Sequence, residues 1–177
     1  MPVIYVDTRQ HRDKHKLKHE WLVAHGIELE RRKLDSGDYM RDGSNITVDT
    51  KASLSEIAGN ISSQHRRFRN ECERAAAAGL RLVVLVEERG YSCIADVCAW
   101  TNNHCAYCSW RKSRKCDPKE PGKCPRHRTA QKPIQGKRLA AAMQTMSDRY
   151  GVRFEFCDPR DTGRRICELL GVDYGAE

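Results

Sequence analysis

The 177-residue sequence has no long hydrophobic run: no stretch approaches the roughly 18 consecutive apolar residues of a membrane-spanning helix. It also lacks the charged-then-apolar leader that directs secretion. We therefore expect no membrane partner and a protein that stays in the cytoplasmic compartment where it is made. Hydrophobic residues make up 39% of the chain, which is enough for the core of one compact domain with a small insertion.

Disulfide bonds are not expected, although the chain contains nine cysteines. Their number is odd, no export signal accompanies them, and a domain of this length buries roughly 70% of its unfolded surface without covalent cross-links. Such cysteines are buried apolar residues, metal ligands or reactive thiols. Four fall between positions 105 and 124, and we expect most of the others to lie in the core: Cys72, Cys93, Cys98, Cys157 and Cys167.

Acidic residues are scarce between positions 101 and 138, where eleven Lys and Arg residues accompany only Asp117 and Glu120. This segment carries a net charge of +9, so the rest of the chain is close to neutral at −1. A concentrated basic block indicates a polyanionic partner, most simply nucleic acid. A solvated basic loop has the same composition, and charge alone does not decide between the two.

Hydrophobic periodicity predicts alternating strands and helices over most of the chain. The expected strands lie near residues 3–6, 27–29, 45–51, 82–86 and 154–156. The expected helices lie near residues 13–25, 53–61, 68–79, 139–146 and 161–170. In the first helix, Leu17, Trp21 and Leu22 form the stripe that should face the core. The pattern predicts an α/β fold, with a mixed central β-sheet flanked by helices on both sides.

Three carboxylates and a lysine form a candidate catalytic group. The alternation of residues 45–51 places Asp49 and Lys51 on the same face of a strand, while Asp38 follows a tight turn and Asp7 ends the first strand. Carboxylates from neighbouring strands can share a hard divalent cation, and a lysine beside them can orient or deprotonate an attacking water and stabilise charge on a phosphate. The alternative is a surface Asp–Lys pair of little energetic value.

Four segments occur in an order that resembles a known family: residues 6–9 (Val-Asp-Thr-Arg), 34–39 (Leu-Asp-Ser-Gly-Asp-Tyr), 48–51 (Val-Asp-Thr-Lys) and 64–68 (Gln-His-Arg-Arg-Phe). Together they resemble the XPF-type nuclease domain, a branch of the PD-(D/E)XK superfamily, and especially its small phage and prophage members. The resemblance covers about residues 3–88 and resumes over 136–171. It implies a restriction-endonuclease-like core.

The activity that the resemblance implies is that of a Mg²⁺- or Mn²⁺-dependent DNA endonuclease, which hydrolyses phosphodiester bonds to leave 5′-phosphate and 3′-hydroxyl ends. The setting would be DNA processing in a bacterial or phage-infected cell. Relatives often form homodimers through this domain. Tandem helix-hairpin-helix domains, which select branched DNA in eukaryotic and archaeal relatives, have no counterpart in these 177 residues, so the resemblance leaves selectivity for branched or flap DNA open.

The resemblance implies roles for individual residues, according to their positions in the matching segments. Asp7, Asp38 and Asp49 match the metal-binding acids of the family, and Lys51 matches its catalytic lysine. Arg9 matches an arginine that contacts phosphate or clamps the site. Two further matches lie on the helix after the lysine, near the scissile phosphate, and we expect them to contact DNA: Gln64 and Arg67.

The match has departures. Asp49-Thr50-Lys51 stands where the family often has Glu-Arg-Lys, which shortens the carboxylate by one methylene and alters its reach. Gln10 stands where a Glu often follows the first arginine. A catalytically silent DNA-binding adaptor on a nuclease-like fold is the alternative reading, although all four expected catalytic residues are present.

A cysteine-rich segment interrupts the alternating pattern, so we divide the chain into a nuclease core (1–100 and 136–177) and an inserted module (101–135). Within 23 residues lie five candidate Zn²⁺ ligands, of which four would complete a tetrahedral site: Cys105, Cys108, Cys116, Cys124 and His127. His104 and Cys98 are outside candidates. Structural zinc would supply folding energy to a segment poor in aliphatic residues. A redox-active thiol pair is the rival interpretation.

An aromatic residue and four cations follow the first cysteine pair: Trp110, Arg111, Lys112, Arg114 and Lys115. Such a mixture is suited to stacking on bases and pairing with phosphates, so we expect it to contact DNA beside the catalytic cleft. Trp110 could instead pack over the zinc site. A third reading is a zinc-dependent module whose basic block meets an acidic protein surface.

Overall fold

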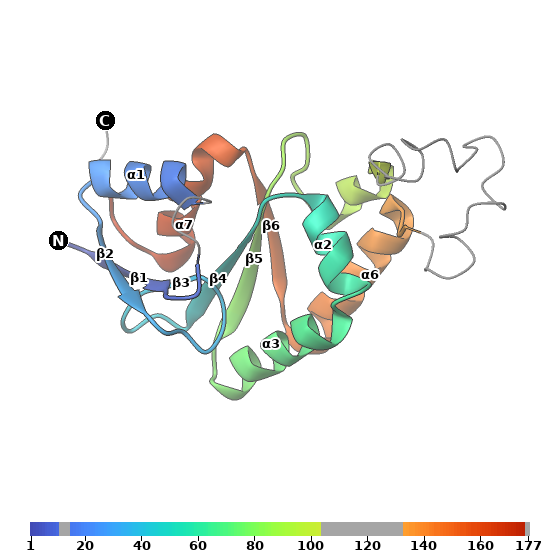
Figure 1. The fold of residues 1–177 in the computed structure, drawn as a ribbon, viewed down its shortest axis with the longest axis horizontal. Coiled ribbons are helices and arrows are strands. Elements are labelled where there is room, and N and C mark those ends of the chain that lie inside the picture. The colour runs from blue at the N-terminus through green and yellow to red at the C-terminus, as the bar shows by residue number, and fades with distance from the viewer. Residues whose placement is uncertain (11–14, 104–132, 176–177) are drawn as a thin grey trace, which may run out of the picture.

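A computed structural model describes residues 1–10, 15–103 and 133–175. Within them, six strands form one mixed sheet in the order β2-β1-β3-β4-β5-β6 (Figure 1). The strands are β1 (Val3–Asp7), β2 (Glu28–Arg32), β3 (Tyr39–Met40), β4 (Ile46–Lys51), β5 (Arg81–Glu87) and β6 (Arg153–Cys157). β1 pairs parallel with β2 and antiparallel with β3, β3 pairs antiparallel with β4, and β4, β5 and β6 are parallel neighbours. β1, β4, β5 and β6 therefore share one direction.

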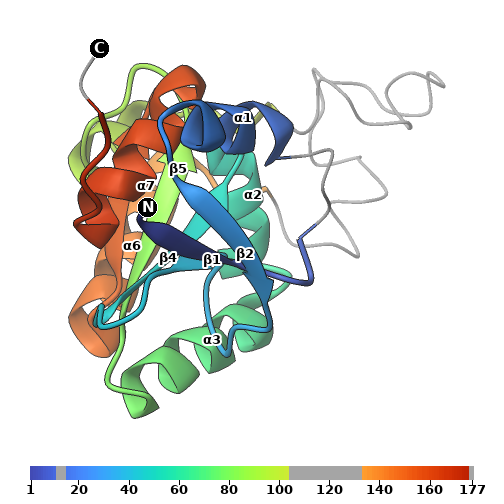
Figure 2. The same ribbon diagram turned by 90° about the vertical axis from the view of Figure 1, so that its left-hand side faces the viewer.

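Helices cover both faces of this sheet. They are α1 (Lys16–Ala24), α2 (Leu54–Ile61), α3 (His65–Ala77), α6 (Gly136–Tyr150) and α7 (Thr162–Leu170), with short 3₁₀ turns η2 (Ile94–Ala99) and η5 (Pro159–Asp161). α1 and α7 lie on one face, and α2, α3 and α6 lie on the other (Figures 1 and 2). The predicted mixed α/β architecture is confirmed.

Strand β5 shows why the layers form. Leu82, Val84 and Val86 pack with α2, α3 and α6, whereas Leu85 packs against the α1–α7 layer. Successive side chains of a strand point to opposite faces, so an uninterrupted apolar run contributes side chains to the hydrophobic clusters on both faces of the sheet. The strand expected near residues 82–86 is confirmed, and its side chains are buried on both faces of the sheet.

The start of α2 is capped by side chains. The Ser53 hydroxyl accepts a hydrogen bond from Glu56 N at 3.2 Å, and the Glu56 carboxylate accepts one from Ala52 N at 3.0 Å. These side chains satisfy backbone donors that the first turn leaves without helical partners. They also fix the direction in which the chain leaves Lys51 at the end of β4.

One prediction about helix α1 is wrong. Leu17 was expected to face the core, but it is 81% exposed, while Lys18 is buried next to it. Leu22 and Lys18 are one helical turn apart and share the inner face. Lys18 can be buried because its ammonium pairs with the carboxylate of Glu87 on β5, an interaction that hydrophobicity patterns do not reveal.

The scattered cysteines divide into two groups. Cys72, Cys157 and Cys167 are buried, whereas Cys93 and Cys98 are exposed, so the prediction that most of these five lie in the core is confirmed. The exposed cysteines belong to the segment of η2, which lies at the edge of the core. Within the described residues, no helix combines the length and the apolar character needed to cross a bilayer.

The two ends of the inserted segment are joined by hydrogen bonds. Asn102 donates through its backbone to the side-chain oxygen of Gln135 and through its side chain to the carbonyl of Ile134, both at 3.1 Å. Gly136 N donates to Trp100 O at 3.1 Å, and a Cβ on Gly136 would collide with that same carbonyl oxygen. Only glycine permits this approach, so residues 102 and 134–136 form a closed base for the insertion.

Candidate active site

The C-terminal ends of the parallel strands bring acidic side chains to one edge of the sheet. Asp7 ends β1, Lys51 ends β4 and Glu87 ends β5. There they line a hollow of about 480 Å³, which we call the carboxylate pocket. Its charged residues are Asp7, Arg9, His15, Lys18, Asp38, Asp49, Lys51, Glu56, Arg67, Glu71, Arg74 and Glu87. The pocket thus contains all four residues predicted to be catalytic.

Asp38 is held between two strands by backbone and side-chain contacts. Its Oδ2 atom accepts hydrogen bonds from Thr50 N at 2.9 Å and from the Thr50 hydroxyl at 2.8 Å. Its carbonyl accepts a bond from Asp7 N at 2.9 Å, and its own N donates to Val48 O at 2.8 Å. Asp38 is therefore fixed relative to both Asp7 and β4, and Thr50 has a positioning role that the sequence did not indicate.

The turn before Asp38 requires glycine. Gly37 has φ +70°, in the left-handed region, and a Cβ there would collide with the hydroxyl of Thr47 on β4. Gly37 N also donates to the Glu71 carboxylate at 3.2 Å. This contact ties the Asp38 turn to helix α3, so the turn is placed by the sheet on one side and the helix on the other.

Asp7 is almost fully buried, and its charge is matched by Arg9. Arg9 Nε lies 2.6 Å from Asp7 Oδ2, and the other end of the guanidinium donates to Leu34 O at 2.6 Å. The Arg9 side chain is still 58% exposed. Of the two roles considered for Arg9, clamping the site matches these contacts.

Asp49 and Lys51 form a buried ion pair at 2.6 Å, with side chains only 5% and 13% exposed. Burial raises the pKa of Asp49 well above its ordinary value; Lys51 opposes this shift, and the carboxylates of Asp38 and Glu71 add to it. Burial alone would lower the pKa of Lys51, but Asp49 and the other two carboxylates outweigh burial and raise that pKa. Lys51 therefore remains a cation.

Sequence reasoning did not assign several ionisable residues of the pocket, among them Glu71, Lys18 and Glu87. Glu71 projects from α3, and Lys18 and Glu87 form an ion pair whose side chains are 7% and 12% exposed. Glu87 stands directly after the apolar run of β5, just as Asp7 stands directly after the apolar run of β1. This shared pattern could have identified Glu87 as a residue of the site. No comparable signal marks Lys18 or Glu71, because both lie on helices with many other charged residues.

The two polar residues expected on α3 lie in different places. Arg67 lines the carboxylate pocket, whereas Gln64 lines an adjacent hollow along the outer side of the helix. The zinc candidates Cys105, Cys108, Cys116, Cys124 and His127, and the expected DNA contacts Trp110, Arg111, Lys112, Arg114 and Lys115, lie outside the described residues.

The acids share one pocket, but each already has its own partner. Asp7 is paired with Arg9, Asp49 with Lys51, and Asp38 accepts bonds from Thr50. Across the described parts of the chain, no group of three or more His, Cys, Asp or Glu side chains is placed so that it could hold a metal ion. Metal binding by Asp7, Asp38 and Asp49 stays a prediction.

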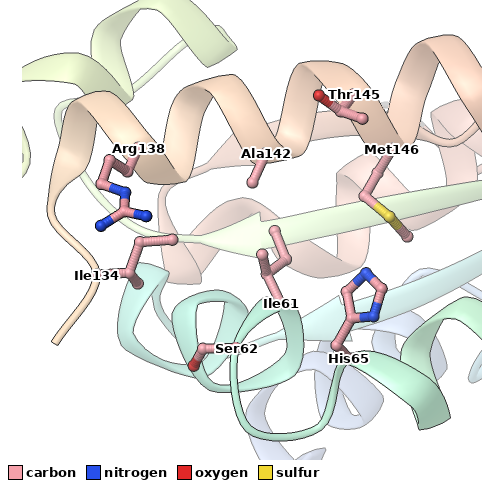
Figure 3. Close-up of a pocket in the computed structure, with 8 residues that line it drawn as sticks. All are labelled: Ile61, Ser62, His65, Ile134, Arg138, Ala142, Thr145 and Met146. Atoms are coloured by element: carbon pink, nitrogen blue, oxygen red, sulfur yellow. The ribbon is translucent and has the colours of Figure 1, made fainter. Parts of the chain in front are cut away.

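A separate hollow, of about 750 Å³, lies between the α2–α3 turn and α6 (Figure 3). Ile61, Ile134, Ala142 and Met146 contribute apolar side chains, and the residues lining it include no carboxylate. The ionisable side chains that line it are His65 and Arg138, so it lacks the cluster of carboxylates that would hold a hard divalent cation. The carboxylate pocket is therefore the candidate active site, although it is the smaller of the two.

The mixed sheet with helices on both faces, together with acids at the ends of its parallel strands, defines a restriction-endonuclease-like fold. Among solved structures, the chain is similar to XPF from Aeropyrum pernix, with a TM-score of 0.55 and 21% sequence identity. The match covers 96% of this chain and 60% of that chain. No family model matches the sequence, and no curated protein does either. The similarity concerns the fold.

Proposed function

We propose that the protein is a metal-dependent DNA endonuclease that hydrolyses phosphodiester bonds. The single observation that carries this proposal is the arrival of Asp7, Asp38, Asp49 and Lys51 in one pocket from three separate segments of the chain. The fold of an archaeal XPF supports it, since that protein is similar over 96% of this chain. A nucleic acid substrate also agrees with the net charge of +8.

The acids of the pocket fit Mg²⁺ or Mn²⁺ by the chemistry of their donors. Asp7, Asp38 and Asp49 offer hard carboxylate oxygens, which these ions prefer. The buried Oδ2 atom of Asp49 receives no well-aligned hydrogen bond within the described residues, and Lys51 is the cation that neutralises it. When bound, the ion would activate water and offset charge that develops on the phosphate.

The side chains themselves would orient the reaction. Lys51 keeps its proton, so it would stabilise negative charge on a non-bridging phosphate oxygen instead of removing a proton from water. Arg9 and Thr50 would hold Asp7 and Asp38 in place. As an oxygen–phosphorus bond forms from water, the bond from phosphorus to the 3′ oxygen breaks, and that oxygen takes up a proton.

We also propose, for the inserted segment, that four of the five candidate ligands Cys105, Cys108, Cys116, Cys124 and His127 bind structural Zn²⁺. The support is their spacing in the sequence and the closed base formed by Asn102, Gln135 and Gly136. Substrate shape, branched or flap DNA among the candidates, is tested with the panel below. A role in phage or bacterial DNA processing is a separate proposal. Assembly as a homodimer is a further proposal.

The first prediction tests catalysis directly. Labelled branched, flap, single-stranded and plain duplex DNA are incubated with Mn²⁺ or Mg²⁺ and with wild-type protein, Asp49→Asn or Lys51→Ala. Cleavage by the wild type should fall at least about 100-fold in both variants, because each removes a charge from the buried pair beside the phosphate. Matched controls are Asp148→Asn on α6 and Lys16→Ala on α1, two exposed positions that should cut at the wild-type rate.

Other outcomes have clear meanings. Cleavage that persists unchanged in Asp49→Asn and Lys51→Ala would show that another site, or a contaminant, cuts the DNA. Binding of DNA without cleavage under every metal condition would overturn the enzyme and favour the catalytically silent adaptor.

A further inference from the structure

Helix α3 carries basic residues at the end where a helix normally carries acids. Its first turn contains no acidic residue, and the side chain of its N-cap, Gln64, makes no capping hydrogen bond. Yet His65, Arg66 and Arg67 open the helix. Positive charge at this end opposes the helix dipole and costs stability. Such a local conflict between sequence and structure is typical of a functional surface, and here an anion would resolve it.

Arg66 and Arg67, but not His65, line a hollow of about 480 Å³ beside α3, which we call the arginine hollow. Its lining residues are Ser63, Gln64, Arg66, Arg67, Asn70 and Arg74. None of the six is acidic, aromatic or aliphatic. Among the described residues, neither Arg66 nor Arg67 takes part in an ion pair. The hollow therefore presents donors for an anion and no aromatic side chain on which a base could stack.

The arginine hollow is continuous with the carboxylate pocket, because Arg67 and Arg74 line both. Arg74 Nε donates to Asp35 O at 3.2 Å, which anchors it beside the turn that carries Asp38. A polyanion with one phosphate in the carboxylate pocket would thus have its neighbouring phosphate beside Arg66 and Asn70. Two adjoining hollows that share Arg67 and Arg74 suit a ligand with a charge at each repeating unit, such as a nucleic acid strand.

We propose that the arginine hollow binds a backbone phosphate next to the one that is cleaved, and so positions the DNA strand independently of base sequence. This inference rests on the proposed function. Arg66 is its central residue, since it lines the hollow without lining the carboxylate pocket. The side-chain amides of Gln64 and Asn70 add hydrogen-bond donors to the same hollow.

The second prediction compares Arg66→Gln with Arg69→Gln, which makes the same charge change on the same helix. Arg69 lines neither hollow and pairs with Glu73 at 3.5 Å. Binding of labelled DNA, without added divalent cation, is measured by fluorescence anisotropy on two unrelated sequences at several salt concentrations. Arg66→Gln should raise Kd about tenfold on both sequences and reduce the salt slope by about 1, whereas Arg69→Gln should change Kd less than about twofold.

Two further measurements distinguish a role of Arg66 in positioning the DNA from a role in stabilising the fold. In cleavage assays Arg66→Gln should raise KM and leave kcat unchanged, and Arg66→Lys should restore most of the affinity because a lysine still pairs with phosphate. Arg66→Gln should leave Tm equal or slightly higher, since it removes a cation from the first turn. Unchanged Kd, or a loss confined to one DNA sequence, would overturn the proposal.

The outcomes also distinguish this inference from the proposed function. If wild type cleaves DNA and Arg66→Gln binds and cleaves normally, the arginine hollow is not a phosphate site and the enzyme stands. If no DNA is cleaved but Arg66→Gln still loses affinity on both sequences, the hollow binds DNA and the catalytic proposal falls.

Discussion

Lys51 shows how a buried site decides the role of a side chain. A lysine that acts as a base needs a lowered pKa, which burial can provide. Here the carboxylates of Asp49, Asp38 and Glu71 reverse that tendency and raise the pKa. Of the two roles that the sequence left open, orienting and stabilising charge is favoured over deprotonating water.

The third prediction concerns Asp49 and pH. Its pKa is raised by burial, so protonation favours the folded state, and this contribution to stability is lost as the pH rises through the raised value. A divalent cation competes with that proton, so the increase in Tm produced by Mn²⁺ should grow as the pH is raised from mildly acidic to mildly alkaline. Thermal unfolding with and without Mn²⁺ at several pH values measures this.

Asp49→Asn is the informative variant for that experiment, because it has no proton to exchange for the metal. Its Mn²⁺-dependent change in Tm should be small and insensitive to pH, whereas Asp148→Asn on α6 should behave like the wild type. A wild-type shift of equal size at every pH would argue against Asp49 as a ligand.

At the scale of elements, α1 is attached to the sheet by charge as well as by packing. Leu22 reaches the core, but Lys18, one turn earlier, pairs with Glu87 at the end of β5. Both charges are largely removed from water, so each needs the other. The pair lies at the wall of the carboxylate pocket, and it therefore links the placement of a helix to the shape of the site.

The fourth prediction tests this link. Lys18→Met should lower the free energy of unfolding by about 3 kcal/mol, because it leaves Glu87 buried without its partner. The matched control is Lys16→Met on the same helix, whose pair with Glu20 is exposed and should contribute less than about 1 kcal/mol. Denaturant unfolding provides both values.

A second change to the same pair completes that test. Combining Lys18→Met with Glu87→Gln should recover much of the loss, since neither buried charge then remains. If Lys18→Met costs no more than Lys16→Met, the pair does not hold α1 to the sheet.

The elements were easier to predict than the contacts between them. The apolar run of β5 and the alternation of β4 predict strands directly, because both patterns are formed by residues that are adjacent in the sequence. The outward position of Leu17 depends on Glu87, about 70 residues away, and no local pattern contains that information. The same holds for Glu71, whose place in the pocket follows from the packing of α3.

For the whole molecule, the described residues behave as a core with one interruption. The residues on either side of the inserted segment are joined by hydrogen bonds from Asn102 and Gly136. β5 precedes the inserted segment in the chain and β6 follows it. The two strands are parallel neighbours in the same sheet. The sheet is therefore continuous without the inserted segment, and we expect the core to be stable without that segment.

The fifth prediction follows from this closed base. Replacing residues 104–132 with a short Gly-Ser linker should leave the circular dichroism spectrum unchanged and alter the free energy of unfolding by about 1 kcal/mol or less, because closure depends weakly on loop length. If the module contributes to DNA binding, the same variant should bind DNA more weakly at matched salt. Aggregation, or loss of the cooperative unfolding transition, would show that the core depends on the segment.

The parallel direction of β1, β4 and β5 has a consequence for the newly made chain. Asp7, Asp49 and Glu87 are far apart in sequence, and only the finished sheet brings their strand ends to one edge. A nascent chain that has not yet added β5 lacks a wall of the pocket. All residues that line the pocket lie between positions 7 and 87, so under the proposed function a chain made only as far as α3 could not yet cut DNA, whereas one that includes β5 already carries every pocket residue.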